Sequence, residues 1–175
     1  IRKNNTFLIT KKEAQEQFED LFNESVKLRM NSERPVGVFL SGGVDSSAVL
    51  ASIRKNYSND LNTYSIGFNW KGDEIKEAEQ FSKKLGCDHK NIFCSADDTK
   101  YLPKITWHLD EPIGDGIVLP MYLLSNFAKR DVTVIQCGDG ADEIFGGYLM
   151  HRIMVLAAFY KKLVPNFVNQ KFAIP

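Results

Sequence analysis

Two glycine-rich segments of this sequence carry the residue types that bind phosphates and metal ions. Residues 41–47 read SGGVDSS, and residues 137–148 read CGDGADEIFGGY. In the first segment the adjacent glycines would let a ligand approach the backbone, and serine hydroxyls beside a helix start could hold a phosphate. The carboxylate of Asp45 would repel that phosphate unless a cation lay between them. The segment therefore predicts a phosphate site that contains Mg²⁺.

The first segment differs from the two commonest phosphate-binding loops. A P-loop needs a lysine in G-x-x-x-x-G-K-[ST], and no lysine lies between residues 41 and 53. The dinucleotide pattern G-x-G-x-x-G is also missing. An ordinary tight turn between a strand and a helix is the structural alternative, since Gly-Gly alone is typical of turns. Three serines and Asp45 directly after an apolar run favour the phosphate site.

The second segment places three carboxylates, those of Asp139, Asp142 and Glu143, within five residues. Such carboxylates repel one another unless a cation neutralises them. An EF-hand calcium loop does not fit, because the pattern D-x-[DN]-x-[DN]-G is not met, and a solvated acidic turn is the other alternative. The segment predicts a cation-binding loop.

An alternation of apolar patterns predicts the elements that would position both segments. Apolar runs predict strands at residues 36–40, 63–68, 90–94 and 132–136. Helical periodicity predicts helices at residues 10–30, 46–56, 73–85, 97–109, 120–129 and 142–163, the last broken at Gly146 and Gly147. This order predicts an α/β fold with a mainly parallel sheet and helices on both faces. Both glycine-rich segments follow strands, so they should lie at one edge of the sheet, where ligands bind.

Length, composition and charge limit the classes of function. With 175 residues, 43% of them hydrophobic, the chain suits a single domain over residues 1–175. Its 22 basic and 22 acidic residues give zero net charge, which argues against a nucleic acid or an anionic membrane as partner. The longest apolar run has eight residues, whereas roughly 20 are needed to span a bilayer. Three cysteines without a C-x-x-C pair, and a polar start without a signal peptide, indicate the cytoplasm.

The two glycine-rich segments resemble motifs of one enzyme family. SGGVDS resembles the pyrophosphatase loop of the N-type ATP pyrophosphatases, and GDGADEIFGGY resembles the G-[DE]-G-x-D-E-x-F-x-G-Y motif of the asparagine synthetase synthetase domain. Residues 64–68 and 110–112 resemble the family's second strand and its D-E-P stretch. The resemblance covers residues 10–148. It implies the adenine nucleotide alpha hydrolase-like fold, also called the PP-loop fold.

The resemblance also implies ATP and Mg²⁺ as cofactors and assigns roles to individual residues. The nucleotide would be bound by Phe39, Leu40, Ser41, Gly42, Gly43, Asp45, Ser46, Ile66, Cys137 and Gly138. Magnesium would be bound by Asp45 and Asp142. Asp139 stands where asparagine synthetases often have glutamate, a position assigned to substrate or ammonia handling, so it is the expected catalytic residue. The departure from glutamate leaves the acceptor carboxylate open.

The implied reaction is amide synthesis driven by ATP. A carboxylate, L-aspartate above all, would become an acyl-adenylate with release of pyrophosphate, and ammonia would then displace AMP. Ammonia would come from solution, or from glutamine through a glutaminase domain or subunit that this chain lacks. Two alternatives stay open: a related amidotransferase that acts on another carboxylate, and a non-catalytic nucleotide-binding fragment.

Three further expectations concern the chain as a whole. It begins with Ile and ends at Pro175, whereas the family's synthetase domain continues further, so we expect a fragment truncated at its C-terminus. A homodimer stays open. The scattered histidines and cysteines outside the two segments, His89, His108, His151, Cys87 and Cys94, are interpreted as structural or surface residues.

Overall fold

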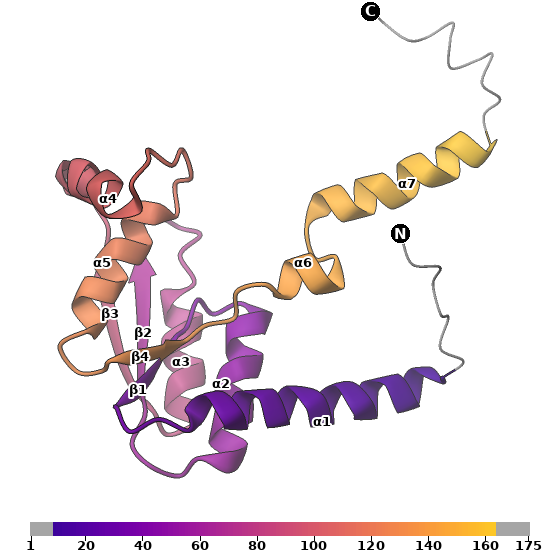
Figure 1. Ribbon diagram of the computed structural model, residues 1–175, viewed down its shortest axis with the longest axis horizontal. Helices are drawn as coiled ribbons and strands as arrows, with labels where there is room; N and C mark the ends of the chain where they lie inside the picture. The colour runs from indigo at the N-terminus through magenta and orange to yellow at the C-terminus, as the bar shows by residue number, and fades with distance from the viewer. Residues whose placement is uncertain (1–8, 164–175) are drawn as a thin grey trace, which may run out of the picture. The chain divides into compact units, whose positions relative to one another are not determined.

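A computed structural model describes residues 9–163 of the chain, with the side chains of residues 9–160. Its four strands form one sheet in the order β3-β2-β1-β4, and each neighbouring pair is parallel (Figure 1). The strands are β1 (Val36–Phe39), β2 (Asn62–Gly67), β3 (Asp88–Phe93) and β4 (Val134–Gln136). The predicted parallel sheet is therefore confirmed.

The strand order reverses at β1. The chain moves outward from β1 to β2 and then β3, with Phe39 paired to Tyr64 and Gly67 paired to Phe93. It then returns to the other side of β1, where Val38 pairs with Gln136 of β4. In parallel sheets of this kind ligands bind beyond the carboxyl ends of the strands at the reversal. Here that place lies between the ends of β1 and β4.

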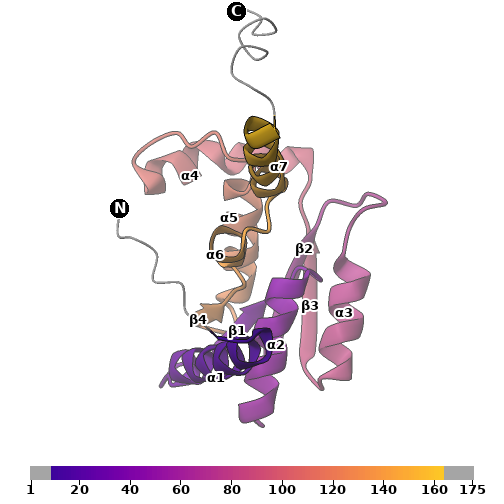
Figure 2. The same cartoon turned by 90° about the vertical axis from the view of Figure 1, so that its right-hand side faces the viewer.

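Helices cover both faces of the sheet, as predicted. On one face the core joins Val38 and Leu40 to side chains of α1 (Lys11–Met30), α2 (Val44–Asn56) and α3 (Ile75–Lys84). On the other face Phe39 and Tyr64 pack against α5 (Val118–Ala128). Neighbouring residues of β1 thus serve opposite cores, because successive side chains of a strand point to opposite faces. In Figure 1 α2 and α3 lie on one side of the strands and α5 on the other, and Figure 2 shows α3 alongside β3.

Local sequence signals explain where α1 begins and how it is attached. Thr10 and Glu13 form the expected capping box: the Glu13 amide donates to Thr10 Oγ1 (3.2 Å) and the Thr10 amide donates to Glu13 Oε2 (2.7 Å).

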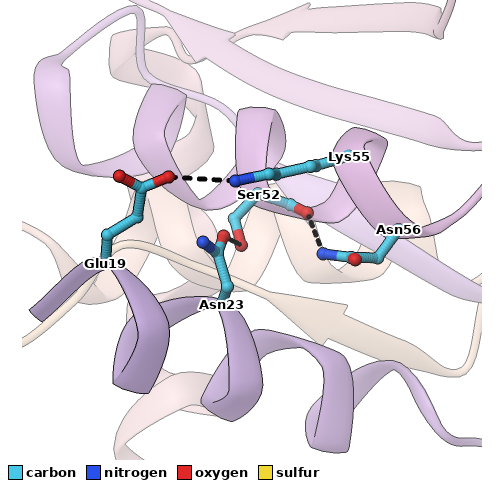
Figure 3. A network of polar contacts seen from close by, with 5 residues as sticks. All are labelled: Glu19, Asn23, Ser52, Lys55 and Asn56. Atoms are coloured by element: carbon cyan, nitrogen blue, oxygen red, sulfur yellow. Dashed lines mark hydrogen bonds and ion pairs between the residues drawn. The ribbon is translucent and has the colours of Figure 1, made fainter. Parts of the chain in front are cut away.

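Figure 3 shows the polar contacts that join α1 to α2. Ser52 Oγ donates to Asn23 Oδ1 (2.7 Å), beside an ion pair of 2.9 Å that links α2 to Glu19 of α1. These contacts hold α1 on the helix that begins at the first glycine-rich segment.

Two predicted elements differ in detail from the structure. The helix expected at 97–109 is a 3₁₀-helix, η1 (Ala96–Tyr101), followed by α4 (Leu102–Leu109). Pro103 lies in the first turn of α4, where its missing N–H removes no helical bond, so it marks the change. The strand expected at 132–136 starts at Val134, because the Val132 amide still donates to the Ala128 carbonyl at the end of α5 (3.0 Å).

The described residues form two compact units, divided between Gly138 and Asp139. The first holds the sheet and its helices. The second holds α6 (Ala141–Phe145) and α7 (Leu149–Leu163), separated at Gly146 and Gly147 as predicted. Across residues 9–163, no helix combines the length and the apolar character that crossing a membrane requires. That residues 1–175 act as one synthetase domain stays a prediction.

Candidate functional site

The loop after β1 is shaped by Gly42. This residue has φ +84°, a left-handed conformation that favours glycine. A Cβ atom built on Gly42 would also lie 2.8 Å from the carbonyl oxygen of Glu74, just before α3. Both the backbone conformation and the close contact therefore require glycine. The second glycine of the pair, Gly43, is the N-cap of α2.

Ser46, in the first turn of α2, fixes the loop from inside. Its buried Oγ accepts a hydrogen bond from the Ser41 amide (3.2 Å) and lies 3.0 Å from Ser41 Oγ. The same hydroxyl lies within 3.3 Å of the Gly43 carbonyl, and the Gly43 amide donates to Ser41 Oγ (3.2 Å). The serine pair thus closes the loop on itself, which keeps its backbone in one shape.

The start of α2 offers donors to an anion. The Ser47 amide donates to the Gly43 carbonyl (3.2 Å), so the preceding amides of Val44, Asp45 and Ser46 have no acceptor within the helix. These amides lie at the N-terminus of α2, directly after the loop, where the helix dipole is positive. A helix start with a glycine loop before it has the donors that can bind a phosphate.

Asp45 lies in the first turn of α2 and is exposed. Its carboxylate has no hydrogen bond or ion pair with any residue in the described part of the chain. A carboxylate that lies beside a phosphate site and is not neutralised by the protein is suited to hold Mg²⁺, which prefers carboxylate and phosphate oxygens. Within residues 9–163, no three Asp, Glu, His or Cys side chains gather into a metal site by themselves.

The end of β4 lies against the same helix start. A Cβ atom built on Gly138 would stand 2.6 Å from the Ser46 amide nitrogen and 2.8 Å from the Asp45 carbonyl carbon. Only glycine at residue 138 allows the backbone after β4 to pack this closely against the start of α2. Cys137, just before it, is exposed. The structure therefore brings the predicted residues Ser46, Cys137 and Gly138 together where the strand order reverses.

The predicted adenine-binding residues are less accessible. The side chain of Leu40 is only 2% exposed and belongs to the core beneath α2. Phe39 is buried in the opposite core, and the half-buried Ile66 packs against that second core. At Leu40 the backbone is also engaged, because its amide donates to the Tyr64 carbonyl (2.9 Å) and its carbonyl accepts from Ser65 Oγ. These residues therefore pack in the cores at the ends of β1 and β2 and support the loop that follows β1.

In the second unit, glycines shape the acidic segment. Gly140 caps the start of α6 with φ +93°, and Gly146 ends it with φ +71°. At Gly147 a Cβ atom would collide with the carboxylate of Asp142, which packs against this backbone. Gly140, Gly146 and Gly147 thus allow a single short helix that carries Asp142 and Glu143. Asp139 precedes this helix and is exposed.

Glu143 and Tyr148 form a hydrogen-bonded pair within the same motif. The Tyr148 hydroxyl donates to Glu143 Oε1 at 2.6 Å. This bond lowers the pKa of the Glu143 carboxyl and raises the pKa of Tyr148 to about 12. The motif therefore specifies the turn after α6 as well as its acidic residues, a pairing that the sequence analysis did not foresee.

Sequence reasoning also missed Asp73, which it placed at the start of a helix. In the structure α3 begins at Ile75, and the Asp73 carboxylate accepts hydrogen bonds from the amides of Phe68 and Trp70. The sequence signal was an aspartate a few residues after a predicted strand and just before a helix, a typical place for a side chain that binds backbone amides.

Two surface hollows lie away from the loop at residues 41–46. One is lined by residues of α1 and α2, and the other by residues of α4, α5 and β4.

Comparison with known proteins places these features in a family. The family model described as Asparagine synthase matches residues 17–173. Asparagine synthetase [glutamine-hydrolyzing] 1 of Bacillus subtilis is 41% identical over 135 residues, which is 76% of this chain and 21% of the relative. A putative asparagine synthetase [glutamine-hydrolyzing] 2 of Methanocaldococcus jannaschii is 41% identical over 163 residues, 91% of this chain and 31% of the relative. The chain thus spans a third or less of these relatives.

Solved structures share the fold. An NMN synthetase from Francisella tularensis matches with a TM-score of 0.51 at 17% identity, over 81% of this chain and 59% of that one. A glutamine-dependent NAD⁺ synthetase from Acinetobacter baumannii, in complex with ADP, matches with a TM-score of 0.52 at 15% identity, over 85% of this chain and 29% of that one. The expected adenine nucleotide alpha hydrolase-like fold is confirmed.

Proposed function

The chain belongs to the asparagine synthase family, and on that premise we propose that it forms the nucleotide-binding part of an ATP-dependent carbon–nitrogen ligase. The enzyme activates a carboxylate, L-aspartate in the first place, as an acyl-adenylate and releases pyrophosphate. Ammonia then displaces AMP, and with aspartate the product is asparagine. The observation that carries this proposal is the closed serine–glycine loop at the start of α2, placed where the strand order reverses.

Activation by ATP answers a chemical difficulty. A carboxylate is a poor electrophile, because direct amide formation would have to expel oxide or hydroxide. When a carboxylate oxygen attacks the α-phosphorus, the bond from that phosphorus to the bridging oxygen of pyrophosphate breaks. Negative charge then builds on the pyrophosphate. The amides of Val44 to Ser46 and the hydroxyls of Ser41 and Ser46 are already fixed in position, so they can stabilise this charge without rearranging.

The donor groups fit a magnesium ion. Asp45 offers a carboxylate that no described residue neutralises, and Asp142 offers a second one, held against Gly147. We assign both to Mg²⁺, which when bound would neutralise carboxylates and phosphate oxygens together. Without a cation, Asp45 would oppose phosphate binding at the very helix start that favours it.

The remaining roles follow from the family and from position. We assign Phe39, Leu40 and Ile66 to the frame around the adenine, which their buried or half-buried side chains support from within the two cores. Cys137 and Gly138 are assigned to backbone contacts with the nucleotide. We assign the backbone of Gly42 and Gly43 to the phosphates, with Gly42 held in place against Glu74. Asp139 is the proposed catalytic residue, which handles the acceptor or ammonia from its exposed position ahead of α6.

Glutamine is the proposed source of ammonia, because the curated relatives are named glutamine-hydrolysing. A glutaminase domain or subunit would supply it, and residues 1–175 would serve as part of the synthetase domain. The partners are small molecules: ATP, the carboxylate and ammonia. We infer a cytoplasmic enzyme, since the three cysteines form no disulfide with one another.

Pyrophosphate release from Mg-ATP tests the proposal. The purified chain is assayed with and without L-aspartate and ammonia, beside Asp45→Ala and a control, Asp60→Ala, at an exposed aspartate outside the loop. We expect release that depends on aspartate, falls roughly a hundredfold in Asp45→Ala, and is unchanged in the control.

The other outcomes distinguish the alternatives. Release with other carboxylates alone would favour a related amidotransferase. No release, together with AMP binding measured by calorimetry, would identify a nucleotide-binding piece without catalysis. Neither release nor binding would refute the assignment of the loop at residues 41–47.

A further inference from the structure

We propose that Asp73 is a positioning residue for the nucleotide site. Its carboxylate holds the turn at residues 68–73. Through Glu74 this turn supports Gly42 in the loop of residues 41–46, here called the phosphate loop. The inference rests on the proposed function. It concerns a residue outside both glycine-rich segments, on the connection between β2 and α3. Asp73 need not touch the nucleotide, because it acts through the backbone of the loop.

The carboxylate of Asp73 organises its own turn. It accepts from the Phe68 amide at 3.0 and 2.9 Å and from the Trp70 amide at 3.1 Å. The Asp73 amide donates back to the Trp70 carbonyl at 3.2 Å, which closes the turn. Hydrogen bonds to an ionised acceptor are roughly twice as strong as those between neutral groups. One side chain thus fixes a turn that includes Asn69 in the left-handed region, with φ +61°.

Other contacts in this turn are fewer. The side chains of Phe68 and Trp70 are 51% and 67% exposed, and the Trp70 ring packs against Gly72, where a Cβ atom would lie 2.7 Å from it. Its entry is anchored at Gly67, whose carbonyl accepts from the Cys94 amide at 2.8 Å. A side chain at Gly67 would meet Ile75 and the Asp73 carboxylate, so the two ends of the turn are in contact. Between these ends, the Asp73 carboxylate makes the side-chain hydrogen bonds to the backbone of the turn.

The exit of the turn reaches the phosphate loop. Glu74 follows Asp73, and its carbonyl oxygen would lie 2.8 Å from a Cβ atom on Gly42, with its own Cβ at 3.0 Å. The backbone at Glu74 is therefore the wall against which Gly42 packs. If the turn loosens, this wall can shift, and the open amides at the start of α2 lose their fixed direction.

Asp73 does not serve as an ordinary helix cap. The N-cap of α3 is Glu74, and no side chain caps this helix. The hydrogen bonds of Asp73 point backward along the chain to Phe68 and Trp70. Its removal should therefore loosen the turn rather than unwind α3, and this separates positioning from general stability.

The test compares Asp73→Ala, Asp73→Asn and a matched control, Asp60→Asn, at an exposed aspartate after α2. We measure AMP and ATP affinity by calorimetry, the KM values for ATP and aspartate, and the thermal midpoint. We expect Asp73→Ala to weaken nucleotide binding about tenfold while the KM for aspartate stays unchanged. Asp73→Asn retains one oxygen acceptor, so it should restore part of the loss. Asp60→Asn should change nothing.

Amide hydrogen exchange supplies a readout that needs no ligand. In Asp73→Ala we expect faster exchange at Phe68 and Trp70, with α3 still protected. We also expect faster exchange at the amides of Ser41 and Gly43, which flank Gly42 and donate to Ser46 Oγ and Ser41 Oγ. Unchanged exchange at Ser41 and Gly43, or equal losses of affinity for nucleotide and aspartate, would overturn the proposal. If the unaltered chain binds no nucleotide, the proposed function fails, whereas the exchange at Ser41 and Gly43 still decides whether Asp73 controls the loop.

Discussion

Gly138, at the end of β4, lies so close to Ser46 that a Cβ atom on it would stand 2.6 Å from the Ser46 amide nitrogen. These residues are far apart in the sequence, yet they meet because β4 pairs with β1 and the strand order reverses between them. The missing side chain at Gly138 lets the backbone after β4 pack directly against the start of α2. This contact joins the ends of two strands into one site.

Substitution Gly138→Ala should therefore damage both the fold and the site. The atoms in the way are backbone atoms of Asp45 and Ser46, which cannot turn aside as a flexible side chain can. We expect a loss of about 1–3 kcal/mol in the free energy of unfolding, measured with urea, and at least about a tenfold loss of AMP affinity. Gly116→Ala is the matched control, because a Cβ atom there meets nothing within 4 Å. Equal behaviour of the two variants would contradict this view.

Ser46→Ala should loosen the loop at residues 41–46. The substitution removes the acceptor of the Ser41 amide and the hydroxyl partner of Ser41. Because Ser46 is buried, we expect a loss of about 1–2 kcal/mol of stability together with weaker AMP binding, measured by urea unfolding and calorimetry. Ser58→Ala, at an exposed serine outside the loop, should have neither effect. Full nucleotide affinity in Ser46→Ala would show that the serine pair does not shape the site.

Tyr148 should ionise at unusually high pH. Its hydrogen bond to Glu143 raises the pKa of Tyr148 from 10.0 to about 12. The stabilisation from this bond is therefore complete between pH 4.5 and pH 10.0 and is lost as the pH rises through about 12. A difference ultraviolet titration of the unaltered chain against Tyr148→Phe isolates this one phenol. A difference curve centred near pH 10 would refute the hydrogen bond.

The stabilisation from the hydrogen bond between Tyr148 and Glu143 should also be lost at low pH. The Tyr148 hydroxyl lowers the pKa of Glu143 below 4.5. Its contribution to stability is present above pH 4.5 and is lost as the pH falls through the lowered pKa. Tyr148→Phe should remove this contribution, so the two chains should converge in stability at low pH.

His89 should make the protein less stable in mild acid. Its Nδ1 lies 2.9 Å from Thr63 Oγ1, and its Nε2 is buried with no partner among the described residues. Burial lowers the pKa of His89, although the charge of Glu79 opposes this. The unfolded chain thus binds the proton more readily, and stability is lost as the pH falls from 6.5 through the lowered pKa. We expect the free energy of unfolding, measured with urea, to depend less on pH across this range in His89→Asn than in the unaltered chain. The same pH dependence in both chains would contradict the prediction.

Much of the fold can be predicted from the sequence because the signals are local. The Thr10–Glu13 capping box marks the start of α1, and the apolar run at residues 36–40 matches a strand that is buried on both faces. The loop of Ser41 to Ser46 was also predictable, since glycine and serine have local conformational and hydrogen-bonding preferences. Pro103 signalled a disturbance of its helix, although not the change from a 3₁₀-helix to α4.

The tertiary structure decided how distant segments combine. Strand order depends on pairing between residues far apart in the chain, so the contact of Gly138 with Ser46 follows from the sheet and not from either segment. The helical periodicity of residues 73–85 predicted that Asp73 belongs to a helix. In the structure its carboxylate instead accepts hydrogen bonds from the amides of Phe68 and Trp70 in the preceding turn. Leu40 likewise became a buried support, because β1 lies at the centre of two cores. By itself the sequence determined the local shape of the loop at residues 41–46, through glycine and serine, and long-range packing determined which backbone groups surround that loop.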